Sequence, residues 1–329
     1  LPNPRNFEEL LIVGHEIVNA PSNSILGSLR GGVELQKREK VLAAFGSPVF
    51  QSNYSVKTNT NVDLASLQTV EGHERWRQAV RDIELNADSF DPSAIEPLFY
   101  TARELANLRD VVGSAESMFA VDFEANRDNV LKSDLSQYSI VHFATHGLLD
   151  PKRPEHSGLL LSTITPDGKA QNGFLSLQDV YQLRAPVNLV VLSACQTGLG
   201  KDVRGEGLIG LTRGFMYAGA SSVVASLWKV DDEATAELMK HLYSNMLEKG
   251  MTPAAALREA QNSIREQPLW RAPYYWAGFT LQGDYSLVVP PNTNRTYSTI
   301  LLAGATVLAA GLALWLFLRR RASRTTPAV

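Results

Sequence analysis

The chain has 329 residues, and 44% of them are hydrophobic, which is enough for the core of one large domain or two ordinary ones. The formal net charge is −3, and no basic run precedes the last few residues, so we expect no nucleic-acid partner. The single cysteine excludes an intrachain disulfide and a metal site made of several cysteines. The chain begins with Leu1 and not with Met, and we expect that it is part of a longer protein whose preceding sequence, with any signal peptide, is missing.

Apolar runs alternate with helix-period patterns along most of the chain. Strand, helix and strand in this rhythm predict βαβ units, and hence an α/β fold with a mostly parallel sheet flanked by helices. We expect helices to start at three places: at Ser176, at Asp231 or Asp232, and at Thr252 with Pro253. We expect strands at 41–46, 117–121, 139–147, 159–162, 188–198, 222–228 and 276–282, and helices at 71–83, 102–112, 125–131, 177–183, 208–217, 231–247 and 253–264.

The carboxyl-terminal part reads as a membrane anchor. Residues 286–299 form a polar linker after a domain at 1–285, and residues 300–318 carry no charge. As a helix they would span about 28 Å, close to the thickness of the bilayer core. A basic tail follows at 319–329. The positive-inside rule would keep this tail cytoplasmic and place the domain across the membrane, and a tail-anchored arrangement is the alternative.

Two of the apolar runs end in chemically useful residues. The run at 139–147 ends in His146 and Gly147, and the run that starts at Asn188 leads to Cys195, the only cysteine. If these strands are parallel neighbours, an imidazole lies beside a thiol, which is the minimal pair of base and nucleophile. Gly147 lacks a side chain, so its backbone N–H can approach an oxyanion closely. The alternative is that Cys195 is simply a small buried side chain.

These motifs resemble a known family. His146-Gly147 together with Cys195-Gln196-Thr197-Gly198 is similar to the CHAT domain, a caspase-like member of the cysteine peptidase superfamily that contains caspases, separases and gingipains. The resemblance extends through 205–207, 222–228, 230–232 and 273–279, and it covers roughly residues 11–284.

The resemblance implies a cysteine endopeptidase without a cofactor. Cys195 would be the nucleophile, His146 the base and then the acid, and the backbone N–H groups of Gly147 and Cys195 the oxyanion donors. Partners would be a protein substrate and an upstream tetratricopeptide-repeat module or another regulator, and the source would be bacterial. The rival is an inactive scaffold that signals by binding. Metacaspases carry Asp two residues before the cysteine; Ser193 stands here, so the cleavage preference does not carry over.

Other polar residues follow the same strand edge. Asp231 and Asp232 follow a strand end, where they cap a helix or contact a substrate side chain, and Glu206 would line the rim of the cleft from a glycine-rich loop. Residues 205–210 match G-x-G-x-x-G, but a seven-residue loop separates them from the strand, which argues against dinucleotide binding. A nucleotide-binding switch that uses this glycine-rich loop is a second rival function, and the absence of a Gly-Lys-Ser/Thr element argues against it. His142 and His146 are four apart on a strand, about 13 Å, so we expect a core histidine at His142 and no metal site.

Overall fold

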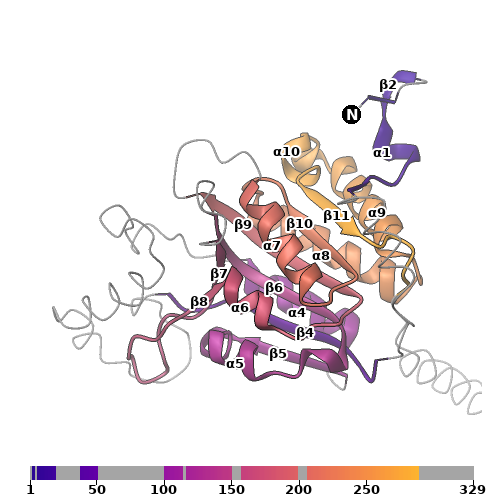
Figure 1. Cartoon of the computed structure of the whole chain (residues 1–329). Coiled ribbons are helices and arrows are strands. Elements are labelled where there is room, and N and C mark those ends of the chain that lie inside the picture. Colours follow the sequence, from indigo (N-terminus) through magenta and orange to yellow (C-terminus); the bar gives the residue numbers. More distant parts are fainter. Residues whose placement is uncertain are drawn as a thin grey trace, which may run out of the picture. The chain divides into compact units, whose positions relative to one another are not determined.

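The computed structural model describes residues 2–3, 6–19, 38–50, 100–113, 116–149, 157–198 and 206–288 (Figure 1). Two compact units divide the chain, residues 1–290 and 291–329, and all described residues belong to the first. The predicted helix at 71–83, most of the predicted loops, the linker after residue 288, the membrane segment and the basic tail lie outside the described residues.

The described strands are β1 (Pro2–Asn3), β2 (Asn6–Leu10), β3 (Val18–Asn19), β4 (Lys40–Gly46), β5 (Ser117–Val121), β6 (Tyr138–Leu149), β7 (Gly158–Leu160), β8 (Phe174–Ser176), β9 (Leu189–Gly198), β10 (Ser222–Ser226) and β11 (Phe279–Gly283). The α-helices are α1 (Leu11–Gly14), α4 (Thr101–Val112), α5 (Arg127–Lys132), α6 (Leu177–Gln182), α7 (Glu206–Tyr217), α8 (Asp232–Leu247), α9 (Pro253–Glu266) and α10 (Pro273–Trp276). Single 3₁₀ turns are η3 (Asp122–Glu124), η4 (Leu135–Gln137) and η6 (Pro268–Trp270).

A nine-stranded sheet organises this part of the chain. Its main order is β3-β11-β10-β9-β6-β4-β5, and β7 and β8 extend from β6. Strands β5, β4, β6, β9 and β10 are parallel neighbours, β11 is antiparallel to β10, and β7 is antiparallel to β6. The expected α/β fold with a mostly parallel sheet is confirmed, and β6 and β9 lie side by side at its centre.

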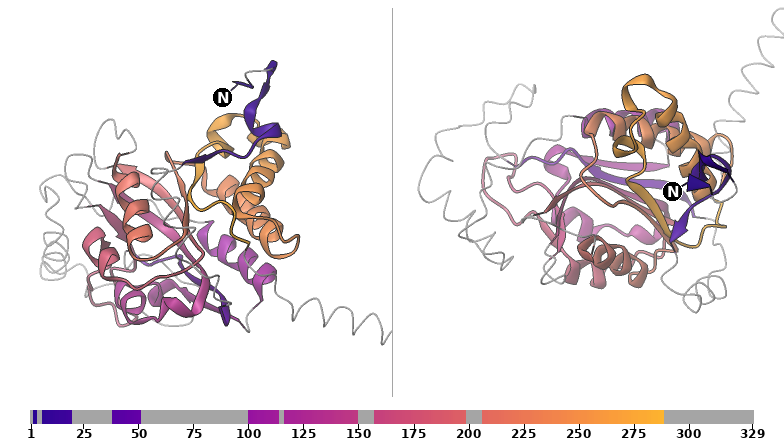
Figure 2. Two further views of the ribbon diagram at one scale, coloured as in Figure 1. Left: turned by 45° about the vertical axis from the view of Figure 1, so that its right-hand side comes forward. Right: turned by 90° about the horizontal axis from the view of Figure 1, so that it is seen from above.

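Helices cover both faces of the sheet, as the view from above shows (Figure 2). Alternate residues of each central strand enter different cores, because successive side chains of a strand point to opposite faces. Ile140 of β6 and Val191 of β9 pack with helices α4, α8 and α9. Val141 and Val190 pack on the other side with α5, α6 and α7. Burial on both faces explains why these strands read as continuous apolar runs.

The expected helix starts are confirmed. Ser176 and Asp179 form a capping box at α6, and Thr252 caps α9 with Pro253 in its first turn. Asp231 caps α8, since its carboxylate accepts a hydrogen bond of 2.9 Å from the Ala234 N–H. Each cap satisfies a backbone donor that the first turn leaves without an intrahelical acceptor.

Several expected boundaries were wrong, among them the end of the strand at 222–228, which stops at Ser226. The last strand begins at Phe279, because Pro273 starts a short helix that includes Trp276. Strand β6 continues to Leu149, since β7 pairs with its extension. Helix α7 begins at Glu206, so Glu206 belongs to a helix terminus, where an acidic residue suits the helix dipole, and not to the preceding loop.

Candidate active site

The structure brings His146 and Cys195 together on neighbouring strands. In the parallel ladder between β6 and β9, His146 is the direct register partner of Cys195. The ladder runs without a shift from Ile140 opposite Leu189 to Leu149 opposite Gly198. The two predicted reactive residues therefore lie at one level of the sheet, three register pairs before its carboxyl edge, which is where open α/β folds bind their ligands.

His146 lies in a buried environment. Its exposed fraction is 2%, and its ring packs against Phe50 with a centroid distance of 5.4 Å. The next residue, Gly147, pairs with Gln196 of β9 on one side and with Leu159 of β7 on the other. Thr145 on the opposite face of β6 donates its hydroxyl hydrogen to the Leu160 carbonyl oxygen. Strand β7 thus holds the end of β6 from one side and β9 holds it from the other.

A buried polar cluster lies on the same two strands, nearer to their amino ends. Glu104 of α4 is 1% exposed, and its Oε2 accepts a hydrogen bond of 3.0 Å from the Ser193 hydroxyl. Its Oε1 lies 2.9 Å from Nε2 of His142, an ion-pair contact outside hydrogen-bond geometry. Nδ1 of His142 lies 3.0 Å from the Tyr243 hydroxyl of α8. His142 is a buried core histidine, as expected, and its Nδ1 is the ring nitrogen with a hydrogen-bond partner.

Sequence reasoning missed Glu104 and Tyr243. A signal for Glu104 was present, because it shares one helical face with Leu108 and Val112, four and eight residues further on. An acidic residue within an apolar stripe needs a buried partner, since burial of an unpaired charge is costly. Tyr243 carries no comparable signal, because a tyrosine is common in helix cores.

The two aspartates at the start of α8 already have internal contacts. Asp231 caps its helix, and Oδ2 of Asp232 accepts a hydrogen bond of 2.8 Å from the Tyr100 N–H at the start of α4. Burial raises the pKa of Asp232, and the nearby charges of Glu104 and Asp231 add to this effect against the opposing hydrogen bond. The side chain of Glu206 lies outside the described residues.

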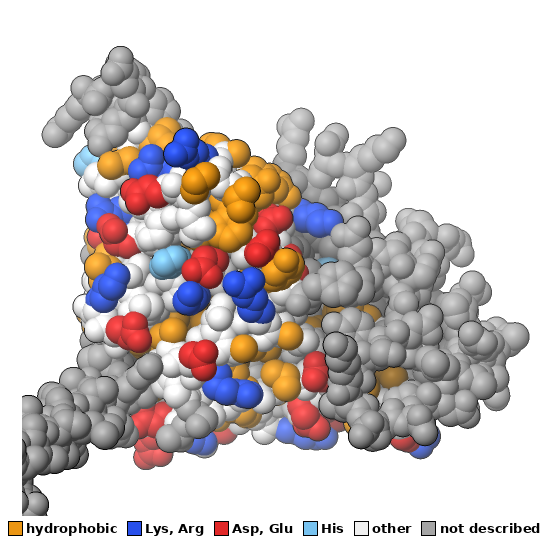
Figure 3. Space-filling model, turned by 180° about the vertical axis from the view of Figure 1, so that it is seen from behind, with side chains coloured by type: hydrophobic (Ala, Val, Ile, Leu, Met, Phe, Trp, Pro, Cys, Tyr) orange, Lys and Arg blue, Asp and Glu red, His pale blue; other side chains and the backbone are white. Residues whose placement is uncertain are grey.

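A surface pocket lies apart from the predicted site residues. It has a volume of about 450 Å³ and is lined by Leu10, Arg265, Glu266, Arg271, Pro273 and Trp276. None of the predicted site residues lines it. Hydrophobic side chains also gather on the upper part of the face that carries α8 and α9, among interspersed charges of both signs (Figure 3). In the described part of the chain, no cluster of His, Cys, Asp and Glu suits a metal ion.

The family model of the CHAT domain matches residues 1–284 of the chain. The chain belongs to the CHAT domain family. This CHAT domain is 30% identical to human tetratricopeptide repeat protein 28 over 316 residues, which cover 86% of the chain and 12% of the human protein. It is 31% identical to the mouse protein of the same name over 59% of the chain and 8% of that protein.

The CHAT domain chain therefore spans about a tenth of the length of these curated relatives. Both relatives are mammalian and give no support to the expected bacterial source. Among solved structures, it resembles the Arg-specific cysteine proteinase gingipain R, at 13% identity and a TM-score of 0.41 over 77% of the chain and 48% of that protein. It also resembles separase from the Saccharomyces cerevisiae separase–securin complex, at 13% identity and a TM-score of 0.39 over 82% of the chain and 14% of that one.

No described helix is both long and apolar enough to cross a membrane. The predicted span at 300–318 lies outside the described residues.

Proposed function

We propose that this CHAT domain is a cysteine endopeptidase that uses His146 and Cys195 as a catalytic dyad. The observation that supports the proposal most is the register partnership of the two residues in neighbouring parallel strands. Directly paired residues of adjacent strands share one face of the sheet, and the proposal is that the imidazole and the thiol lie close enough there for proton transfer.

The first half of the reaction forms an acyl-enzyme. The imidazole of His146 accepts the proton of the Cys195 thiol, and the thiolate attacks the carbonyl carbon of the scissile peptide bond. The carbonyl oxygen takes up the negative charge, and the backbone N–H groups of Gly147 and Cys195 are proposed to stabilise it. When the C–N bond breaks, His146 gives its proton to the leaving amine, and a thioester to Cys195 remains.

The second half of the reaction hydrolyses the acyl-enzyme, with His146 acting first as the base and then as the acid. His146 removes a proton from a water molecule, whose oxygen attacks the thioester carbonyl. The C–S bond breaks, the carboxylic acid product leaves, and His146 returns the proton to the Cys195 sulfur. No cofactor takes part in either half.

The activity is proposed to require an activating partner. His146 is only 2% exposed, so a peptide reaches it only after neighbouring residues move. Since the curated relatives are named as tetratricopeptide repeat proteins, an upstream repeat module is a suitable regulator. Asp231, Asp232 and Glu206 remain proposed substrate contacts, and residues 300–318 a proposed membrane anchor.

A cleavage assay tests the proposed function. The full chain would be incubated with a diverse peptide library, with and without the native sequence that precedes it, and products would be read by mass spectrometry. Cys195→Ala removes the nucleophile and His146→Ala the base. Ser286→Ala serves as the matched control, because its hydroxyl contacts only Asp284 near the end of the domain.

The expected result is cleavage by the parent chain and the control, lost in both dyad variants by about 10³-fold or more. The cleaved bonds would also define the residue preference. Cleavage that persists in Cys195→Ala would contradict the dyad. Absence of cleavage in every form, including the form with the preceding sequence, would favour the inactive scaffold.

A further inference from the structure

Glu104 is a buried carboxylate for which the proposed reaction has no direct use. It lies in the first turn of α4, on the face that packs against the sheet, and only 1% of its surface is exposed. Burial of a carboxylate costs several kcal/mol unless other groups compensate it. Its contacts therefore show what this charge does in the fold.

The two oxygens of Glu104 contact two different strands. Oε2 accepts the hydroxyl hydrogen of Ser193 on β9 at 3.0 Å, and Oε1 lies 2.9 Å from Nε2 of His142 on β6. These are the two central strands that carry Cys195 and His146. A single carboxylate thus joins both strands from the helix layer above them.

Two of these contacts are hydrogen bonds. The Tyr243 hydroxyl donates to Nδ1 of His142, and the Ser193 hydroxyl donates to Oε2 of Glu104. Nε2 of His142 lies 2.9 Å from Oε1 of Glu104 without the alignment of a hydrogen bond. Burial raises the pKa of Tyr243 well above its usual value, and the nearby carboxylate of Glu104 raises it further, so its hydroxyl keeps the proton. The chain of contacts runs from α8 through β6 to α4 and β9.

The residues of this cluster precede the proposed dyad along β6 and β9. Ser193 precedes Cys195 by two residues, about 7 Å along the strand, and His142 precedes His146 by four, about 13 Å. Even-numbered spacing keeps each pair on one face of the sheet. The register partner of Ser193 is Ala144, a small residue in the core that lies between the sheet and α4.

We propose that Glu104 is a positioning residue for the His146–Cys195 pair, whose carboxylate binds Ser193 and His142 together and so fixes how β9 and β6 present the thiol and the imidazole. The inference rests on the proposed function for its catalytic consequence, but not for its effect on the thiol. It explains why an ionisable residue occupies the apolar face of α4.

The groups around Glu104 are buried parts of the fold, which favours a role in positioning other side chains. The groups that face it are Ser193 of β9, His142 of β6, and Tyr243 and Asp232 of α8. Asp232 in turn accepts the Tyr100 N–H, which holds the first turn of α4 beside the start of α8. The helix end that carries Glu104 is therefore itself fixed to its neighbour.

Alkylation of the thiol measures the position of the dyad without any substrate. Cys195 is the only cysteine, so the rate at which iodoacetamide labels the full chain at pH 7 reports this thiol alone. The variants are Glu104→Ala, Glu104→Gln and Ser193→Ala. Glu233→Gln is the matched control, because Glu233 joins the same two helices at the surface through Arg103, at 3.5 Å. Peptide cleavage and the melting temperature would be measured in parallel.

We expect Glu104→Ala to lower both the labelling rate and kcat by about 10²-fold, the size of effect known for small misplacements of reacting groups, with KM unchanged. Glu104→Gln keeps an acceptor for Ser193 and should restore part of the loss. Ser193→Ala removes one hydroxyl, too small a change to unfold the domain, and should lower both rates by about tenfold. Glu233→Gln should match the parent chain.

Labelling and kcat of Glu104→Ala and Ser193→Ala within twofold of the parent would overturn the positioning role and leave the peptidase proposal intact. A rise of KM alone would overturn it too, because it would make Glu104 a binding residue. If the parent cleaves no peptide, yet labelling falls in the Glu104 and Ser193 variants at an unchanged melting temperature, the peptidase proposal fails and the positioning role stands.

Discussion

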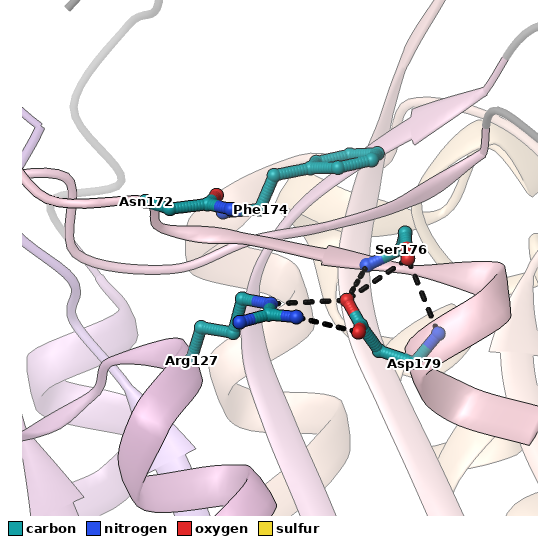
Figure 4. Close-up of polar contacts among 5 residues, drawn as sticks. All are labelled: Arg127, Asn172, Phe174, Ser176 and Asp179. Carbon is teal, nitrogen blue, oxygen red and sulfur yellow. Dashed lines mark hydrogen bonds and ion pairs between the residues drawn. The ribbon is translucent and has the colours of Figure 1, made fainter. Parts of the chain in front are cut away.

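At the scale of single residues, two aspartates in different environments make the stability of the fold depend on pH in opposite directions. Asp179 receives two hydrogen bonds from Arg127, of 2.6 and 3.0 Å, and caps α6 together with Ser176 (Figure 4). Burial alone would raise the pKa of Asp179, but the Arg127 and Ser176 hydrogen bonds outweigh it and lower the pKa. Among the described residues no Lys or Arg pairs with Asp232, and burial raises the pKa of this carboxyl.

Asp179→Asn should therefore lower the free energy of unfolding by about 2 kcal/mol at pH 7. Since the folded state depresses this pKa, the stabilisation is present above the pKa of the unfolded chain, 3.8, and is lost as the pH falls through the lower folded value. Urea unfolding at pH 7 and at the lowest pH at which the domain folds measures the difference. Asp128→Asn at the exposed Lys132 pair is the control, with an expected change below about 0.5 kcal/mol.

Asp232→Asn should show the reverse pH dependence. Its raised pKa means that the ionised form disfavours the folded state, so the parent chain loses stability as the pH rises through the pKa of 3.8 and the higher folded value. An asparagine still accepts the Tyr100 N–H through its carbonyl oxygen. The variant should be as stable as the parent or up to about 1 kcal/mol more stable at pH 7, and its advantage should vanish in acid. A destabilised variant at pH 7 would contradict this reading.

At the scale of elements, the short strand β7 holds the active end of β6. Leu160 pairs with His146, Leu159 with Gly147 and Gly158 with Leu148. A Cβ atom at Gly158 would collide with the Leu175 carbonyl oxygen and the Phe174 ring of β8. The close approach of β7 and β8 thus depends on a glycine at this position.

Gly158→Ala should cost about 1–3 kcal/mol of stability, because overpacking forces backbone shifts, and should lower the labelling rate of Cys195 as β7 moves away from β6. Gly14→Ala is the matched control, since nothing lies within 4 Å of the added Cβ. Denaturant unfolding and iodoacetamide labelling check both effects. If the two alanine variants had equal stabilities and equal labelling rates, the role of β7 would be contradicted.

Most of the central strands and helix starts could be predicted from the sequence. Continuous apolar runs identified the central strands, and capping residues placed the starts of α6, α8 and α9. The βαβ rhythm indicated parallel neighbours, but only the structure gives the register of β6 and β9. Strand β8 was missed, because three residues carry no period, and Trp276 was assigned to a strand although Pro273 starts a helix there.

At the scale of the whole molecule, the membrane anchor at 300–318 stays a prediction with a direct test. Replacement of both Leu308 and Leu312 by Arg puts two charges at the centre of the segment, each opposed by about 2.5–3.5 kcal/mol. The parent chain should remain with membranes after alkaline extraction, and the double variant should be released. Ser298→Arg, just before the segment, should behave as the parent. A parent chain released by extraction would contradict the anchor.

Long-range contacts at this scale lie beyond sequence reasoning. The contacts of Glu104 with His142 and Ser193 join residues 38 and 89 positions apart, and pattern analysis treats each segment by itself. The apolar face of α4 is a signal that Glu104 needs a buried partner, but only the packing of α4 on β6 and β9 identifies that partner.

The central claim is that His146 and Cys195 act as one unit, and the pH dependence of thiol labelling tests it most directly. The rate of iodoacetamide labelling would be measured from pH 5 to 10 in the full chain and in His146→Ala. We predict that labelling of the parent reaches half its maximum well below pH 8.5, the value of an ordinary thiol, and that the variant returns to about that value. Identical profiles near pH 8.5 in both chains would contradict the dyad.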